Sequence, residues 1–328
     1  MNALPPTTRR AALKLGGAAL ASVAFPALAQ SDYPSKPIRI IVPLPSGGVA
    51  DALVRSMADR LQVTMKQTII VDNKPGGLFA IGLQALLAAP SDGYTLLHIN
   101  AGMAAIQAAT KRYDLLKQLA PVTEANYGPT MLFVSMKAPF TNIAEMIAYG
   151  KANPGRINYG TLGPGSIEHL VGHSIAKSAG FEATPVPYKG MPDAVVSMLQ
   201  GDIHFFSTVY QVGKPFVDKG QMRLLGVFDE QRLANLPDVP TVRQLRLDAP
   251  LTSYWAGFAV QPDVPPPIIE VLRREIAAAV MFPAVRERTE TAGSIASCSA
   301  SPAEFRQKIA HDLAWMGQAV KSAGLNLS

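Results

Sequence analysis

The stretch PIRIIVPLPSGGVADALV (residues 37–54) contains an apolar run, a turn with two adjacent glycines and the start of an amphipathic segment. The run predicts a β-strand over residues 37–44, and Val49, Leu53 and Met57, spaced four apart, predict one face of a helix. Glycine turns between a strand and a helix often hold anions, because free N–H groups and the positive end of the helix dipole both favour negative charge. The question is which anion this turn holds.

A second segment, YGTLGPGSIEHLV (residues 159–171), repeats this order of strand end, Gly/Pro turn and helix start much later in the chain. Two such turns, one in each half of the chain, suggest a ligand held between two lobes. The alternative interpretation is that both are ordinary strand-to-helix turns of one large sheet, since glycine-rich turns are frequent without ligands.

Strand-like runs alternate with amphipathic segments along the rest of the chain. The runs cover residues 37–44, 67–73, 94–99, 130–136, 157–161, 184–188, 202–209, 222–228 and 255–260. This alternation predicts an α/β fold with largely parallel sheets.

The N-terminal segment TTRRAALKLGGAALASVAFPALAQ (residues 7–30) has a basic start, an apolar middle and an end of small residues. It predicts a signal peptide over residues 1–29, because the apolar part is short for a membrane span and Ala27-Leu28-Ala29 fits an A-x-A cleavage site. A retained N-terminal anchor is the alternative. Arg9-Arg10 resembles the twin-arginine export pattern, so the export route stays open.

Composition and charge argue against several function classes. Charged residues make up 16% of the chain and hydrophobic ones 48%, which indicates a compact soluble protein rather than a disordered one. Removing the predicted leader, with its Arg9, Arg10 and Lys14 and no acidic residue, lowers the formal charge from +6 to +3. No Lys/Arg cluster indicates nucleic-acid binding. Cys298 is the only cysteine, so an intrachain disulfide is impossible.

Phosphate sites are not supported by the turns. No lysine follows Gly47-Gly48, as a P-loop would need, and Gly163-Pro164-Gly165 lacks the third glycine of a dinucleotide site. A carboxylate, which carries less charge, could be held by N–H groups and hydroxyls alone. We therefore predict no cofactor.

Two enzymatic alternatives remain open. Ser46 or Ser166 could be the nucleophile of a hydrolase, although neither lies in a G-x-S-x-G motif, and Ser166 is also explained as the N-cap of its helix. His169 and His173 lie four apart and could bind zinc, but no third ligand follows them. Otherwise His169 would reach the adjacent glycine loop. We predict no metal.

The remaining polar residues have simpler interpretations. Asp51 and Glu168 lie in first turns of helices, where an acid stabilises the dipole by about 0.3–1 kcal/mol. Asp51 could instead bind an amine or a hydroxyl of a ligand. The isolated histidines His98, His204 and His311 are predicted to be structural.

The motifs together resemble a known family. YPSKPIRIIVPLPSGGVAD, DNKPGG, SDGYTLL, KANPGRINYGTLGPGSIEHL, VPYKG and LPDVPTV resemble, in this order, signature segments of the tripartite tricarboxylate transporter receptors, also called Bug proteins. The resemblance covers essentially the whole mature chain. It implies a periplasmic binding protein of the type II class, with two α/β lobes and a ligand cleft between them. The lobes would be residues 31–130 plus 253–328, and residues 131–252.

The resemblance also implies binding residues. In the family the two glycine loops typically hold the carboxylate, partly through bridging waters, and segments after two further strands line the pocket. Carried over to this chain, the predicted ligand-binding residues are Leu44, Ser46, Gly47, Gly48, Val49, Ala50, Asp51, Ala101, Gly102, Met103, Thr161, Gly163, Gly165, Ser166, His169, Ser207 and Thr208.

This chain departs from the family pattern at informative positions. Leu44 and Ser46 replace the Phe and Pro of the common PFPPGG, and Ser207 stands where relatives often have Asp or Asn, which weakens selection for an amino group. Leu44, Met103, Phe205 and Phe206 would allow an apolar or aromatic ligand body, although the two phenylalanines could instead belong to the core. Lys189 either contacts a carboxylate or is a solvated turn residue.

We therefore expect an exported, non-enzymatic receptor, acting as a monomer, that captures a small mono- or dicarboxylate whose body could be aromatic. It would hand this ligand to the membrane subunits of a tripartite tricarboxylate-type transporter, with no nucleic acid involved. Affinity would come from hinge closure over the ligand. The alternatives are an exported zinc enzyme, an exported serine hydrolase, and an interaction protein that has lost its ligand.

Overall fold

The computed structural model describes residues 33–233, 236–247 and 252–325. The predicted signal peptide over residues 1–29 lies outside the described residues. The chain divides into a unit of Met1–Ser35 and a unit of Lys36–Ser328, and everything below concerns the second unit. No helix among the described residues has the length and apolar character that a membrane span requires.

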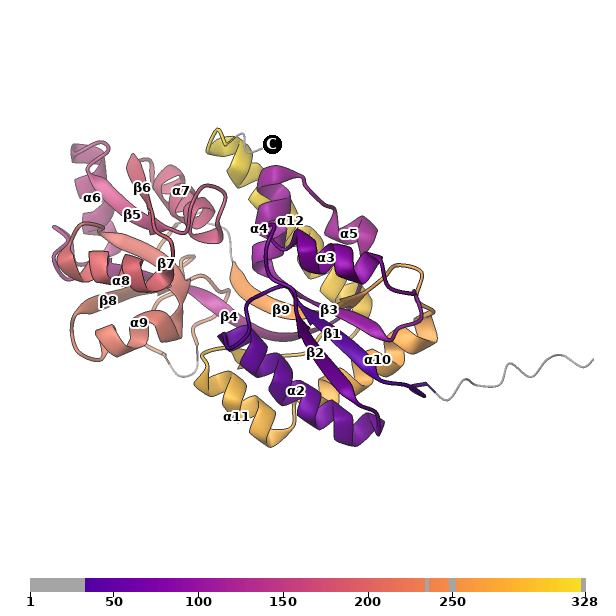
Figure 1. The fold of residues 1–328 in the computed structure, drawn as a ribbon. Helices are drawn as coiled ribbons and strands as arrows, with labels where there is room; N and C mark the ends of the chain where they lie inside the picture. Colours follow the sequence, from indigo (N-terminus) through magenta and orange to yellow (C-terminus); the bar gives the residue numbers. More distant parts are fainter. Residues whose placement is uncertain (1–32, 234–235, 248–251, 326–328) are drawn as a thin grey trace, which may run out of the picture. The chain divides into compact units, whose positions relative to one another are not determined.

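The second unit alternates strands and helices, as the sequence predicts (Figure 1). In chain order the elements are β1 (Ile38–Val42), α2 (Val49–Met65), β2 (Ile69–Asn73), α3 (Ala80–Leu87), β3 (Thr95–Asn100), α4 (Ala101–Thr110), α5 (Leu115–Gln118), β4 (Ala120–Ser135), α6 (Ile143–Ala152), β5 (Ile157–Thr161), α7 (Ile167–Ala179), β6 (Ala183–Pro187), α8 (Met191–Gln200), β7 (Phe205–Val209), α9 (Tyr210–Val217), β8 (Met222–Val227), β9 (Ser253–Val260), α10 (Pro266–Val280), α11 (Pro283–Thr291), β10 (Ile295–Ala296) and α12 (Pro302–Ser322).

The strands form one sheet in the order β2-β1-β3-β9-β4-β7-β5-β6, with β8 and β10 also paired to β4. The outer groups are parallel, since β1 pairs in parallel with β2 and β3, and β5 with β6 and β7. The centre is antiparallel, because β9 returns from late in the chain to lie between β3 and β4. The α/β prediction is confirmed, whereas the expectation of largely parallel pairing is wrong for the centre.

The long strand β4 changes partners along its length. Residues 120–129 pair with β9, and residues 130–135 pair with β7 and β8. The sequence predicts only the second part, because the first part has no apolar run and buries polar side chains such as Thr123 and Glu124. The division into two lobes at residues 130/131 and 252/253 remains a prediction.

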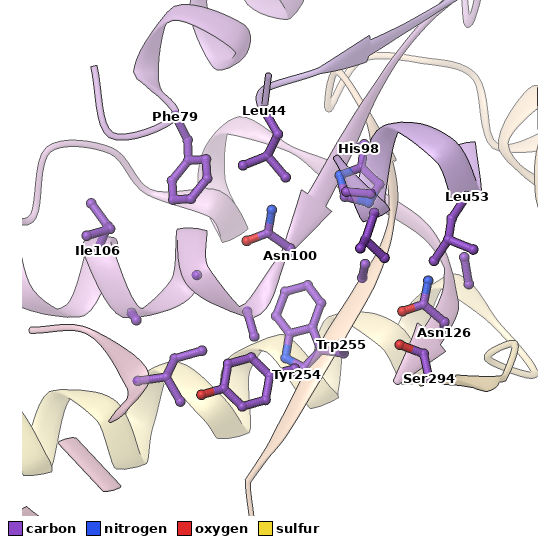
Figure 2. A pocket seen from close by; sticks show the side chains of 18 of the residues that line it. Leu44, Leu53, Phe79, His98, Asn100, Ile106, Asn126, Tyr254, Trp255 and Ser294 are labelled. Carbon is purple, nitrogen blue, oxygen red and sulfur yellow. The ribbon is translucent and has the colours of Figure 1, made fainter. Parts of the chain in front are cut away.

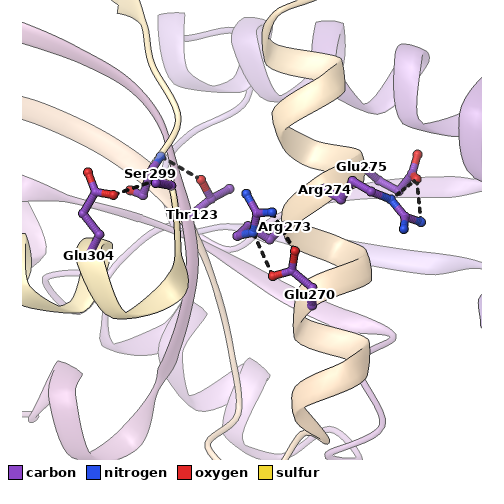
Figure 3. Close-up of polar contacts among 8 residues, drawn as sticks. Thr123, Glu270, Arg273, Arg274, Glu275, Ser299 and Glu304 are labelled. Carbon is purple, nitrogen blue, oxygen red and sulfur yellow. Dashed lines mark hydrogen bonds and ion pairs between the residues drawn. The ribbon is translucent and has the colours of Figure 1, made fainter.

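Polar contacts tie the C-terminal part of the chain to β4. The Thr123 hydroxyl accepts a hydrogen bond from the Ser299 N–H at 3.2 Å (Figure 3). The Ser299 hydroxyl accepts one from the Glu124 N–H at 3.3 Å. Lys308 of α12 pairs with the buried Glu124 carboxylate. These bonds give partners to buried polar groups of Thr123 and Glu124, which offsets the cost of burying this part of a strand without an apolar run.

Aromatic residues of β4, β5 and β7 form part of the core. Phe205 stacks on Tyr159 with ring centroids 5.3 Å apart, and Phe206 stacks on Phe133 at 5.7 Å. Both side chains are fully buried, and neither lines the cavity described below. Of the two interpretations of Phe205 and Phe206, the structure supports the core.

Candidate functional site

A cavity of about 500 Å³ lies beside both glycine turns. The first turn contributes Leu44 and the start of α2, and the second contributes Ser166 and the start of α7. Side chains from distant parts of the chain, including Phe79, His98, Asn100 and Trp255, complete its wall (Figure 2). The fold thus brings the two similar sequence segments to one site.

Three helices begin at this cavity, because first-turn residues of α2, α4 and α7 line it. Each helix start carries unpaired N–H groups and about half a positive charge. Among the described residues, no lysine or arginine side chain lines the cavity. The positive potential therefore comes from the backbone, which suits an anion of low charge.

The first turn is held together by Asp51, the third residue of α2. Gly47 lies in the left-handed region with φ +83°, and its N–H donates to Asp51 Oδ2 at 2.9 Å. The same carboxylate accepts from Arg55 Nε and Asn73 Nδ2, both at 3.0 Å. These bonds, the one from Arg55 above all, lower the pKa of Asp51 to about 2. Asp51 is buried and does not line the cavity, so it stabilises the turn.

The second turn is built in the same way around His169, the third residue of α7. The Gly165 N–H donates to His169 Nδ1 at 3.1 Å, and the Ser166 hydroxyl caps the helix by accepting from the His169 N–H at 3.3 Å. Burial and, next, the nearby His173 lower the pKa of His169, which keeps the ring a neutral acceptor. The predicted N-cap at Ser166 is present, and His169 contacts the glycine loop.

The zinc alternative finds no support in the described part of the chain. His169 Nδ1 is occupied by the loop, and His173 Nε2 lies 2.8 Å from the Ser322 hydroxyl of α12. No group of three or more His, Cys, Asp or Glu side chains among the described residues could hold a metal ion.

Two polar side chains of β3 line the cavity, and each has one buried polar atom without a partner among the described residues. Asn100 Oδ1 caps α4 by accepting from the Met103 N–H at 3.2 Å, and the Nδ2 donor on the other side of the amide has no partner. His98 Nδ1 is also unpartnered, and burial lowers the pKa of His98 to about 4, so the ring is neutral. A ligand with acceptor atoms would satisfy such groups.

The family resemblance implies that the segment from Asn100 to Met103 lines the pocket, but Asn100 was not among the predicted ligand-binding residues, and His98 was assigned a structural role. A usable signal was their position at the carboxyl end of a strand, directly before a helix, where α/β sheets commonly bind ligands. Their orientation toward the cavity is visible only in the fold.

Aromatic side chains form another part of the wall that the sequence did not indicate. Trp255 and Tyr254 come from β9, and Phe79 precedes α3. Trp255 is fixed by a hydrogen bond from its Nε1 to Asp312 Oδ2 at 2.5 Å and by an edge contact with Phe305 at 5.4 Å. The cavity therefore offers rigid apolar surface for a ligand body.

The structure brings only part of the predicted set to the cavity wall. Leu44, Val49, Ala50, Ala101, Gly102 and Ser166 line it. The others do not: Ser46, Gly47, Gly48, Asp51, Met103, Thr161, Gly163, Gly165, His169, Ser207 and Thr208. Met103 is fully buried, Ser207 and Thr208 are buried in β7, and Ser46 is exposed. Lys189 is also exposed and away from the wall.

Comparisons with known proteins agree with this geometry. A family model described as "Tripartite tricarboxylate transporter family receptor" matches residues 53–325. The chain is 31% identical over 280 residues to a UPF0065 protein of Cupriavidus necator, covering 85% of each chain. It is 30% identical over 318 residues to the protein BugT of Bordetella pertussis, covering 94% of this chain and 95% of BugT.

Solved structures are similar over nearly their whole length. A TctC solute binding protein from Polaromonas superposes with a TM-score of 0.79 at 27% identity, covering 88% of this chain and 99% of that one. A Rhodopseudomonas palustris protein solved with adipate gives a TM-score of 0.74 at 26% identity, and the match covers 90% of this chain and 99% of that one. These neighbours have the same α/β architecture as this chain.

Proposed function

Because the chain belongs to the tripartite tricarboxylate transporter receptor family, we propose that it captures a small organic carboxylate and hands it to the membrane subunits of such a transporter. The family resemblance inferred from the motifs is confirmed. Receptors of this family are periplasmic solute-binding proteins, not enzymes. The carboxylate, its apolar or aromatic body and the transporter are the proposed part.

The observation that carries the proposal is the chemistry of the cavity wall. Helix starts and the unpartnered Asn100 Nδ2 supply positive potential and a donor, without any cationic side chain among the described wall residues. A hydrogen bond to a charged group contributes about 1.5–3 kcal/mol, and a helix start about 0.3–1 kcal/mol or more when partly buried. A carboxylate needs no more than this, whereas a phosphate would commonly use a lysine or arginine.

The ligand body would rest on the aromatic part of the wall. Phe79, Tyr254 and Trp255 offer faces and edges for an aliphatic chain or a ring. The two turns belong to the two predicted lobes, so a ligand touching both would favour a closed arrangement over an open one. This is the physical basis we propose for hinge closure and for recognition by a membrane partner.

A thermal-shift screen of the mature chain against aliphatic and aromatic carboxylates tests the proposal. A ligand at one hundred times its Kd is expected to add about 2.7 kcal/mol of stability. The absence of a shift with every carboxylate in the screen would contradict the proposal.

Asn100→Asp then tests the site. The substitution keeps the oxygen that caps α4 and replaces the free donor by a negative charge, so we expect carboxylate affinity to fall by at least about thirtyfold, or 2 kcal/mol. Asn142→Asp, at the N-cap of α6 and away from the cavity, is the matched control. Equal affinity of both variants and the wild type would exclude Asn100 as a ligand donor.

A further inference from the structure

Glu168 places a carboxyl group in the wall of the cavity. It is the second residue of α7, it is 4% exposed, and it lines the cavity together with Tyr254 of β9. The Tyr254 hydroxyl donates to Glu168 Oε1 at 2.7 Å. No ion pair joins Glu168 to a cationic side chain within the described residues.

Burial is the main cause that raises the pKa of Glu168, and the groups around it do not compensate the charge of the ionised carboxylate. Tyr254 from β9 and the neutral His98 from β3 are the titratable side chains that share the cavity wall with it. On its own helix His169 bonds the glycine loop, and the Tyr159 ring of β5 lies 6.3 Å from that imidazole.

Helices α4 and α12, which pack on α7, supply no counter-ion to the cavity either. Helix α4 has no titratable residue. On the side of α12, His173 and Lys177 both bond Ser322, while the buried Asp312 lies behind Trp255 and is a further acid. The part of the cavity near Glu168 is therefore poor in positive charge.

The carboxyl group of Glu168 would also orient the ligand. An acid in the first turn offsets the positive end of the helix dipole, so the start of α7 favours an anion less than the starts of α2 and α4. In α2 the corresponding second residue is Ala50, and α4 begins with Ala101 and Gly102 beside the free donor of Asn100. A ligand carboxylate would lie at α2 and α4, with its far end toward Glu168 and Tyr254.

We infer that Glu168 restricts the cavity to carboxylates with a single negative charge, whose far end is apolar or carries a neutral hydrogen-bond donor. The inference rests on the proposed function and narrows its ligand class from mono- or dicarboxylates to monocarboxylates. A second carboxylate at the far end would face Glu168 in apolar surroundings without a counter-ion, so the complex would have to take up a proton.

Three probes of equal chain length test this inference by calorimetry: hexanoate, 6-hydroxyhexanoate and adipate, at pH 7 and pH 9. Adipate is the compound with which the Rhodopseudomonas palustris neighbour was solved. We expect the wild type to bind adipate at least about tenfold more weakly than hexanoate at pH 9, a difference of 1.4 kcal/mol. Adipate is doubly ionised at both pH values. A ratio of hexanoate affinity to adipate affinity that is larger at pH 9 than at pH 7 therefore reflects the ionisation of Glu168 and not that of the ligand.

Glu168→Gln removes the charge and keeps the shape. In this variant we expect the adipate and hexanoate affinities to agree within about threefold at both pH values, with hexanoate binding as in the wild type. Glu182→Gln removes an exposed charge just beyond the end of the same helix. This control should keep the ratio of hexanoate affinity to adipate affinity that the wild type has. If the Glu168 variant does not fold, the inference is tested by the wild type alone, through the expected rise with pH of the ratio of hexanoate affinity to adipate affinity.

The possible failures are distinguishable. Binding of adipate as tight as hexanoate by the wild type at pH 9, a ratio that does not rise with pH, or an unchanged ratio in Glu168→Gln overturns this inference alone. No binding of any of the three probes, together with no shift in the wider carboxylate screen, overturns the proposed function and this inference with it.

Discussion

The two glycine turns share one construction but differ in what they present to the cavity. In each, the third residue of the helix accepts the N–H of the glycine four positions earlier: Asp51 from Gly47 at 2.9 Å, and His169 from Gly165 at 3.1 Å. The second residue of each helix instead lines the cavity, and it is Ala50 in the first turn and Glu168 in the second.

This difference separates the structural role of a first-turn residue from its role toward a ligand. The acceptor at the third position holds the turn, and either a carboxylate or a neutral imidazole serves. In the proposed binding mode, the residue at the second position sets the charge near the ligand. We therefore propose that the first turn binds the ligand anion and that the second turn, of similar sequence, disfavours a second anion.

The largest effect is expected from making the first turn resemble the second at this position. Ala50→Glu places a carboxylate at the start of α2, where the ligand carboxylate is proposed to lie, so affinity for hexanoate should fall by at least about a hundredfold, or 2.8 kcal/mol. Calorimetric titration measures this. Ala52→Glu, on the exposed side of the same helix, should bind like the wild type. Wild-type affinity in Ala50→Glu would place the ligand carboxylate elsewhere.

The second expected effect concerns the acceptor of the first turn. Asp51→Asn retains the shape but loses the charge-assisted bonds from Arg55 and the glycine N–H, so the free energy of unfolding at pH 7 should fall by about 1–3 kcal/mol. Denaturant unfolding of the variant and the wild type gives this difference.

The pH dependence of that difference follows from the pKa of Asp51, which folding lowers from 3.8 to about 2. The charged carboxylate therefore stabilises the protein above pH 3.8, and this contribution is lost as the pH falls toward 2. The gap between Asp51→Asn and the wild type should narrow in acid. Asp59→Asn, at an exposed position of the same helix, should show no gap at pH 7. A gap that persists at low pH would contradict this role.

The smallest effect is expected at the acceptor of the second turn. His169→Gln can still accept the Gly165 N–H, so the stability at pH 7 should change by less than about 1.5 kcal/mol. Folding lowers the pKa of His169, so the unfolded chain binds more protons as the pH falls from 7 to 5 and the wild type loses stability. The variant should lose less over this range in parallel thermal melts. Exposed His311→Gln should follow the wild type; identical curves for all three would contradict the assignment.

Much of the fold was predictable because its strands are short apolar runs bounded by turns. The run over residues 157–161 coincides with β5, and the run over residues 222–228 with β8 to within one residue. The first half of β4 was not predictable, because the partners that permit its burial, Ser299 and Lys308, lie far away in the sequence. Antiparallel pairing of β9 with β3 and β4 likewise depends on where a late segment returns to the sheet.

The sequence by itself determined the family, the α/β class and the two turns, since these depend on local patterns of glycine, helix start and apolar period. Only the tertiary structure decided which side chains face the cavity. One step along a helix rotates a side chain by about 100°, so neighbouring first-turn residues point in different directions. The aromatic wall of Phe79, Tyr254 and Trp255 also required the fold, because β9 and the start of α3 meet only when the sheet has formed.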